Sequence, residues 1–203
     1  MEIVLTGTGS PLPDANRAGP STLVKAGDCH VLVDAGRGVL MRMAAAGSLP
    51  VFLSGVLLTH LHSDHICDLN DVITTHWIMS QGNATLAIYG PPGTEEFVDR
   101  QMHALEADIG YRIEHHDQLT NGPKVDVTEL SPGVEFSIND FRIAAAATQH
   151  APVHPTLGYR FENESAVAAL VGDTVPCEGV DELAASADAY VQTVIRSDLV
   201  KLA

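Results

Sequence analysis

Residues 57–71 read LLTHLHSDHICDLND, and three histidines and Asp64 fall within positions 60–65. The apolar run at 56–58 is typical of a buried β-strand. In an extended segment, residues two apart point to the same side, so His60 and His62 converge. A turn after the strand brings Asp64 and His65 to a second point nearby. Because buried polar groups cost free energy unless they are paired, this cluster predicts a binding site rather than a polar loop.

The composition is that of one globular domain. The chain has 203 residues, 45% of them apolar and 18% charged, with a formal net charge of −15. This length suits a single domain over 1–203, and the composition excludes a disordered chain. The acidic surface repels polyphosphate, which argues against a nucleic-acid-binding protein.

The cysteines and the N-terminus indicate the compartment. Cys29, Cys67 and Cys177 are scattered, so they predict neither a disulfide framework nor a CxxC zinc site. The N-terminus lacks the features of a signal peptide, and no apolar run approaches the roughly 18 residues of a membrane span. The sequence therefore predicts a cytoplasmic protein with reduced thiols and no contact with a membrane.

Strands and helices are both expected along the chain. Helical spacing of apolar residues predicts helices at 37–47, 68–82, 94–110 and 181–188. In the third, Thr94 is the expected N-cap and Gly110 the end, and the following residues 111–133 read as polar and turn-rich. Strands are predicted at 1–9, 21–26, 29–34, 54–60, 84–90 and 189–195, with strand pairs at 134–150 around Asn139-Asp140 and at 156–173. The pairs favour an α+β fold with mixed sheets.

The donor set of positions 60–65 indicates which metal would bind. Imidazole and carboxylate groups suit Zn²⁺, with Mn²⁺ or Fe²⁺ as rivals. Two such ions, about 3.5–4 Å apart, would share a hydroxide. The alternative is a polar loop at a sheet edge, which a lone HxH would favour.

HLHSDH resembles the HxHxDH signature of the metallo-β-lactamase superfamily of binuclear metallohydrolases. LTGTGSP, NRAGPSTLV and VLVDAGRGV, all before residue 41, resemble its ribonuclease Z-like branch. The resemblance implies a four-layer αββα sandwich with two metal ions at one edge. It implies that His60, His62 and a later histidine hold the first ion. Asp64, His65 and a final histidine would hold the second, and a further aspartate would bridge the two.

The later ligands can be assigned on this basis. His150 follows the strand-like run RIAAAATQ and is the expected third histidine, whereas His154 is expected to line the pocket. Asp173 ends an apolar strand after Gly172 and is the expected bridging carboxylate. The resemblance makes Asp34 a group that steadies the HLHSDH loop. Asp68 and Asp71 are expected only to cap or begin the helix after His65.

Two features depart from the family pattern. No histidine follows His154, so we expect the 203 residues to lack the C-terminal part that carries the final ligand. If nothing follows, the second ion would bind weakly or take a ligand from a partner subunit. Ribonuclease Z enzymes that process tRNA commonly carry a long arm between the third histidine and the bridging aspartate, and residues 151–172 leave no room for one. Together with the charge, this disfavours RNA as the substrate without excluding it, because the metal chemistry on a phosphodiester would be the same.

The resulting hypothesis is a hydrolase that uses a metal-bound hydroxide on phosphodiester or related ester bonds of a small molecule. Asp64 would orient the nucleophile or accept its proton, and His154 would protonate the leaving group. Arg17, Arg37 and Lys25 are candidate anion contacts. The alternatives are an arylsulfatase or lactonase of the same superfamily, a redox di-iron member, and a degenerate non-catalytic metal-binding protein. A homodimer is a further expectation from the family.

Overall fold

The computed structural model describes residues 1–194 and contains two β-sheets. The first has the order β1-β2-β3-β4-β5-β6 and the second β11-β10-β9-β8-β7. The strands are β1 (Glu2–Gly7), β2 (Ser21–Ala26), β3 (Cys29–Val33), β4 (Leu53–Leu57), β5 (Thr85–Gly90), β6 (Lys124–Glu129), β7 (Glu135–Ile138), β8 (Phe141–Ala147), β9 (Leu157–Asn163), β10 (Ala166–Leu170) and β11 (Ala189–Val191). Both sheets are mixed: β3 to β6 are parallel, and β10 pairs parallel with β11 but antiparallel with β9.

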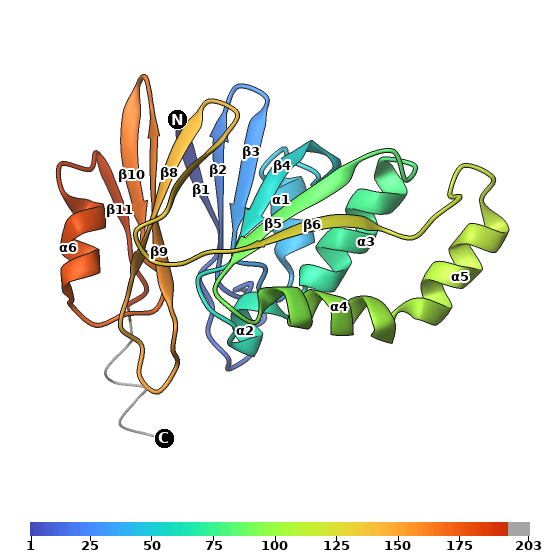
Figure 1. The fold of residues 1–203 in the computed structure, drawn as a ribbon, viewed down its shortest axis with the longest axis horizontal. Coiled ribbons are helices and arrows are strands. Elements are labelled where there is room, and N and C mark those ends of the chain that lie inside the picture. The colour runs from blue at the N-terminus through green and yellow to red at the C-terminus, as the bar shows by residue number, and fades with distance from the viewer. Residues whose placement is uncertain (195–203) are drawn as a thin grey trace.

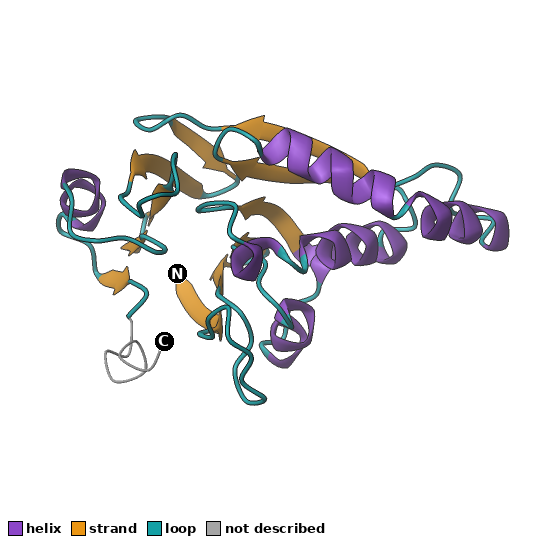
Figure 2. Cartoon of the chain, turned by 90° about the horizontal axis from the view of Figure 1, so that it is seen from below, coloured by secondary structure: helices purple, strands orange, loops and turns teal. Residues whose placement is uncertain are grey.

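The helices cover the outer faces of the sheets (Figures 1 and 2). They are α1 (Val39–Ala45), α2 (Ser63–Ile66), α3 (Leu69–Met79), α4 (Thr94–Ala104), α5 (Glu106–His115) and α6 (Glu178–Ala184), with a 3₁₀ turn η1 (Pro50–Phe52). Within residues 1–194, none of them has the length and apolar character that crossing a membrane requires.

Side chains that alternate along the strands of the first sheet form one apolar layer on each of its two faces. Leu23 and Leu32 pack with α1, α3 and α4 on one face of the first sheet, whereas their neighbours Val24 and Val31 pack between the two sheets. Successive side chains of a strand point to opposite faces, so one strand serves two apolar layers. A third apolar cluster joins α6 to the outer face of the second sheet. These clusters confirm the predicted α+β, four-layer αββα sandwich.

The predicted helix over 94–110 was wrong in extent. The structure has two helices there, joined at Leu105, and Gly110 lies inside α5 instead of ending a helix. A glycine inside an exposed helix costs only about 1 kcal/mol, and the space around Gly110 is open. Thr94 is the first helical residue, not the N-cap; Gly93 takes the cap position with φ 100°.

Two other boundaries also differ from the prediction. Residues 111–133 hold the end of α5 and strand β6, which pairs parallel with β5. The alternation in KVDVTE was a strand signal within a polar segment. The last helix begins at Glu178 rather than at residue 181.

A buried tyrosine ties the second sheet to the first. The Tyr159 ring is fully buried, and its hydroxyl donates a hydrogen bond of 2.6 Å to the carbonyl oxygen of Leu58, just after β4. The backbone N–H of Leu157 donates to the carbonyl of Thr59 at 2.9 Å. These two bonds hold β9 against the segment that leads into HLHSDH.

Tyr159→Phe is therefore expected to lower the free energy of unfolding by about 1–2 kcal/mol, because the buried Leu58 carbonyl would lose its hydrogen bond from the hydroxyl. Urea unfolding followed by circular dichroism measures this. Tyr111→Phe is the matched control, since Tyr111 is 71% exposed on α5. Equal stability of the two variants would contradict the role of the hydroxyl.

Candidate metal centre

The histidine-rich segment lies where several strands end. HLHSDH follows β4 and leads into α2, at the lower edge of the sheets in Figure 1. His150 comes shortly after β8, and Asp173 shortly after β10. Because β8 and β10 both run antiparallel to β9, their carboxyl ends meet at the same edge. The fold therefore brings together three segments that are far apart in the sequence.

One group of three histidines converges on a single point. His60 Nε2 lies 3.0 Å from His62 Nδ1, and His150 Nε2 lies 3.2 Å from the same His62 nitrogen. A tetrahedral zinc ion bound at about 2.0–2.1 Å sets its nitrogen ligands about 3.3–3.4 Å apart. The spacing of these rings thus fits a zinc ion held by His60, His62 and His150.

A second group lies beside the first and shares His60 with it. One potential ligand atom from each of His60, His65 and Asp173 lies within 4.8 Å of the others. His65 Nε2 is 3.6 Å from Asp173 Oδ1, while the other oxygen, Asp173 Oδ2, is 3.8 Å from His150 Nε2. Asp173 therefore presents one carboxylate oxygen to each group, which is the arrangement that a bridging ligand needs.

Two buried atoms of the second group lack hydrogen bonds. Among residues 1–194, three buried side-chain atoms have no hydrogen-bond partner, and His65 Nε2 and Asp173 Oδ1 are two of them. Burying a polar atom without a partner costs roughly 1–3 kcal/mol. Both atoms are of the kind that coordinates a divalent cation, so the donor set fits a metal ion at this place.

The protonation states of the histidines and carboxylates in the cluster favour the binding of a cation. Burial and, after it, the charge of the neighbouring His65 lower the pKa of His60 to about 4, so the ring is neutral and able to coordinate. Burial alone would lower the pKa of His65, but the carboxylates of Asp34 and Asp173 outweigh it and raise that pKa to about 10. Burial would raise the pKa of Asp173, yet the interaction with the His65 ring, 3.6 Å away, holds it below its usual range. A cation between His65 and Asp173 would take over the role of the His65 proton.

Asp34 supports the cluster from beneath. Its backbone has the left-handed φ of 61°, which is uncommon for a residue other than glycine, and its side chain is buried. Asp34 Oδ2 lies 2.7 Å from His65 Nδ1, and Oδ1 accepts the backbone N–H of Thr59 at 2.8 Å. A carboxylate that holds the second ring nitrogen of a histidine fixes the orientation of that ring.

The remaining predicted residues lie around this cluster. Asp64 is buried, and its Oδ2 is 3.9 Å from His65 Nε2. His154 is exposed on the loop after His150 and belongs to neither ligand group; with residues 148–153 it lines an open hollow of about 210 Å³. Asp68 stands at the N-cap position of α3, but its side chain accepts the backbone N–H of Gly38 instead of capping the helix.

Sequence reasoning missed Thr59. The Thr59 side chain is buried and hydrogen-bonds both Asp34 and the ring of His60. The only available signal was its place directly before His60, where a hydroxyl on a buried strand end needs a partner.

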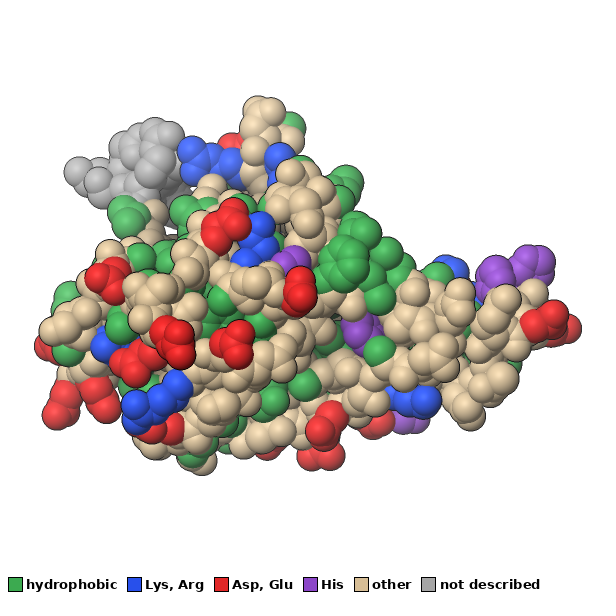
Figure 3. All heavy atoms as spheres, turned by 90° about the horizontal axis from the view of Figure 1, so that it is seen from above, with side chains coloured by type: hydrophobic (Ala, Val, Ile, Leu, Met, Phe, Trp, Pro, Cys, Tyr) green, Lys and Arg blue, Asp and Glu red, His purple; other side chains and the backbone are tan. Residues whose placement is uncertain are grey.

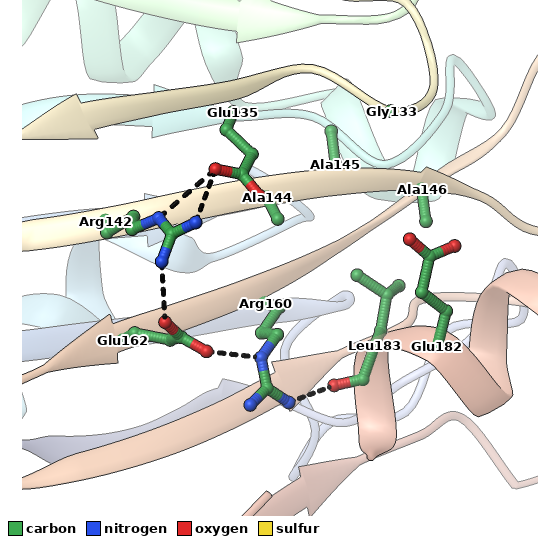
Figure 4. Close-up of a pocket in the computed structure, with 10 residues that line it drawn as sticks. All are labelled: Gly133, Glu135, Arg142, Ala144, Ala145, Ala146, Arg160, Glu162, Glu182 and Leu183. Atoms are coloured by element: carbon green, nitrogen blue, oxygen red, sulfur yellow. Dashed lines mark hydrogen bonds and ion pairs between the residues drawn. The ribbon is translucent and has the colours of Figure 1, made fainter.

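A second hollow, of about 140 Å³, lies on the outer face of the second sheet beside α6 (Figure 4). Arg142 pairs with Glu135 at 2.6 Å and with Glu162 at 3.6 Å. Arg160 pairs with Glu162 at 2.7 Å and donates to the Leu183 carbonyl. Because these charges neutralise one another, the described residues around this hollow offer no free cation to an anionic ligand.

Comparison with known proteins identifies the family. The family described as "Beta-lactamase superfamily domain" matches residues 30–198. A protein named ribonuclease Z from Mycolicibacterium gilvum is 53% identical over 203 residues, which is 99% of this chain and 71% of that protein. Ribonuclease Z from Mycobacterium bovis is 54% identical over 202 residues, which is 98% of this chain and 72% of that protein.

Solved structures show the same architecture. The crystal structure of the short form of human tRNase Z superposes with a TM-score of 0.74 at 21% identity, over 94% of this chain and 76% of that chain. At this identity the likeness concerns the fold, and it matches the αββα layers described above. By its sequence and its fold, the chain belongs to the β-lactamase superfamily and, within it, to the ribonuclease Z family.

Proposed function

We propose that this protein is a metal-dependent hydrolase that cleaves phosphodiester bonds in RNA, with two zinc ions per chain. The observation that carries the proposal is the pair of ligand groups that meet at His60 and Asp173, with two buried donor atoms otherwise unpaired. The names of the relatives support RNA as the substrate class.

In this proposal, His60, His62 and His150 hold one ion, and Asp64, His65 and Asp173 hold the other. When bound, divalent zinc supplies a Lewis acid for the phosphoryl group and a nucleophilic hydroxide at neutral pH. Nitrogen and carboxylate donors suit zinc, although Mn²⁺ and Fe²⁺ use the same ligands. The family also implies a final histidine as a ligand of the second ion. This ligand stays a prediction, and the test is whether the native reading frame continues past Ala203 to a histidine.

The chain's own groups would handle the protons. Asp64 lies buried beside His65, where its carboxylate can orient a water or accept its proton. His154 is exposed on the hollow that His150 also lines, and a substrate could reach it from solvent. We propose that His154 donates the proton to the leaving oxygen.

RNA is favoured here over a small ester, in contrast to the expectation from sequence. The match to the M. gilvum relative runs over 203 residues, the length of this chain, so that relative has no space for a long arm in this region either. The missing arm therefore does not count against RNA. The net charge of −15 still does, and Figure 3 shows acidic side chains spread over one face of the molecule.

A substrate panel tests the proposal. The full-length protein, loaded with zinc, is expected to shorten a precursor tRNA transcript that carries a 3′ trailer, and chelation is expected to stop the reaction. An aryl sulfate, a lactone and bis-p-nitrophenyl phosphate complete the panel. Hydrolysis of the sulfate or the lactone, but not of RNA, would favour the alternative enzymes. Undiminished RNA cleavage after thorough chelation would remove the metal from the mechanism.

A homodimer and a cytoplasmic location remain predictions.

Of the three candidate anion contacts, we propose Arg37, because the other two lie beside carboxylates. Lys25 pairs with Glu2 at 3.0 Å, and Arg17 lies 3.9 Å from Asp14. Arg37 is exposed and has no carboxylate partner among residues 1–194. It follows Gly36, whose backbone is so close to the Asp64 carbonyl that an added Cβ would lie 2.4 Å from it. The backbone directly before Arg37 thus packs against the loop that carries the proposed ligands.

Arg37→Gln is expected to weaken RNA binding and to reduce the slope of log affinity against log salt concentration by about one, as the loss of one phosphate contact would. Filter binding or fluorescence anisotropy over a salt series measures this. Arg100→Gln is the matched control, because Arg100 is exposed on α4 and paired with Glu96. An unchanged salt slope for Arg37→Gln would rule out the contact.

A further inference from the structure

One threonine hydroxyl lies between the buried carboxylate and a proposed ligand. Thr59 Oγ1 is 2.9 Å from Asp34 Oδ2 and 3.0 Å from His60 Nδ1. All three side chains are buried, since Asp34 is 4%, Thr59 2% and His60 0% exposed. Water therefore cannot substitute for these hydrogen bonds without a change in the packing.

The direction of the hydrogen bonds follows from the chemistry of the three groups. A carboxylate only accepts, so the hydroxyl proton of Thr59 is donated to Asp34. The hydroxyl oxygen keeps its lone pairs and can accept, so the partner atom His60 Nδ1 carries the ring proton. A neutral imidazole has one ring proton, and His60 Nε2 is then left with its lone pair, pointing toward His62.

We infer that Thr59 is a positioning residue that connects Asp34 to His60 and fixes the His60 tautomer with Nε2 free for a metal ion. Asp34 orients the His65 ring directly, because its Oδ2 lies 2.7 Å from His65 Nδ1. A single carboxylate thus orients one histidine without an intermediary and another through a hydroxyl. The inference rests on the proposed function, because it assumes that His60 and His65 are metal ligands.

The rest of the Thr59 side chain has a separate packing role. Gly172 has a left-handed φ of 63°, and a Cβ added there would lie 3.0 Å from both Cβ and Cγ2 of Thr59. Gly172 directly precedes Asp173, so the threonine also packs against the turn that places the bridging carboxylate. A useful test must therefore remove the hydroxyl while it keeps the shape of the side chain.

Thr59→Val meets this condition, and Thr59→Ser makes the opposite change, since it keeps the hydroxyl and removes the methyl group. Zinc affinity of the full-length protein, stripped of metal, is measured by competition with a chromophoric chelator, together with thermal unfolding of the metal-free variants. Thr74→Val is the matched control: Thr74 is buried in α3, and its hydroxyl donates to the carbonyls of Asn70 and Asp71 in the same helix.

The zinc dissociation constant is expected to rise about 10–100-fold in Thr59→Val, as is typical when a group behind a metal ligand is lost. It should stay close to the wild-type value in Thr59→Ser and in Thr74→Val. Wild-type affinity in Thr59→Val, or an equal loss in Thr59→Ser, would overturn the role of the hydroxyl. A wild-type protein that binds no zinc would instead overturn the proposed metal centre.

A second measurement applies even where Thr59→Val does not fold. In the ¹⁵N-labelled, metal-free wild-type protein at neutral pH, the His60 ring is expected to carry its proton on Nδ1, with His60→Gln identifying the signal. Nitrogen chemical shifts distinguish the two tautomers of a neutral imidazole. A proton found on Nε2 would overturn the inference.

Discussion

His60→Gln is expected to remove both proposed zinc ions and to reduce RNA cleavage on the order of 10³-fold or more. His60 is a proposed ligand of the first ion, and its fully buried ring also has a nitrogen within 4.8 Å of ligand atoms of His65 and Asp173, so its replacement disturbs both sites. Its ring centroid lies 4.2 Å from that of His65 and 5.1 Å from that of His150. Glutamine has a similar length but offers an amide in place of the imidazole nitrogen, so the packing survives better than the coordination.

Elemental analysis of the purified variant and a thermal-shift titration with zinc measure this result. Zinc that binds only the folded wild-type protein at 100 times its dissociation constant adds about 2.7 kcal/mol to stability, or about 5–10 °C. His60→Gln should lose that shift. His103→Gln is the matched control, because His103 is exposed on α4. Two zinc ions per chain in His60→Gln would show that the ligand set is wrong.

The central part of the site could be predicted because it is local in sequence. HLHSDH places four candidate ligands in one turn after a strand, and the structure holds His60 and His62 with their ring nitrogens 3.0 Å apart. His150 and Asp173 could not be predicted from local spacing alone, because each is recognised as a candidate ligand only by the strand that it follows. The family resemblance supplied those positions, and the fold brings them to the same edge of the sheets.

The supporting contacts could not be predicted in the same way. The hydrogen bonds from Thr59 to Asp34 and from Tyr159 to Leu58 join residues 25 and 101 positions apart. No spacing rule relates such residues, because their approach depends on how the two sheets stack. Asp34 was expected to steady the loop, but its hydrogen-bonded connection to His60 through the Thr59 hydroxyl is seen only in the structure.

The fold was predicted best where a turn signal separates two strands. The Asn139-Asp140 turn gave the correct pair of β7 and β8, and the pair predicted at 156–173 is the observed pair of β9 and β10. The prediction was poorest at 94–133, where Gly110 was taken as a helix end and β6 was overlooked. That region is largely exposed, so tertiary packing imposes little pattern on its sequence; α5 has no buried residue.

Asp173→Asn is expected to remove the second zinc ion while leaving the first in place, and to reduce RNA cleavage on the order of 10²–10³-fold. Asparagine keeps the size of the side chain and one carbonyl oxygen but loses the negative charge. The lost charge is the one that faces His65 at 3.6 Å and His150 at 3.8 Å. The first group keeps its three histidines, and neutral nitrogen ligands alone suffice for a zinc ion.

The contrast between the two variants makes this prediction specific. If Asp173 bridges, Asp173→Asn should bind one zinc ion per chain in calorimetry, whereas His60→Gln should bind none. Asp117→Asn, on the exposed loop after α5, is the matched control and should bind two. Loss of both ions in Asp173→Asn would mean that the groups cannot be filled separately, and retention of both with full activity would remove Asp173 from the centre. Because the Asp173 carboxylate also stabilises the charged His65 ring, metal-free Asp173→Asn is expected to be less stable than the metal-free wild type, so the zinc-induced shift of each protein is measured from its own metal-free value.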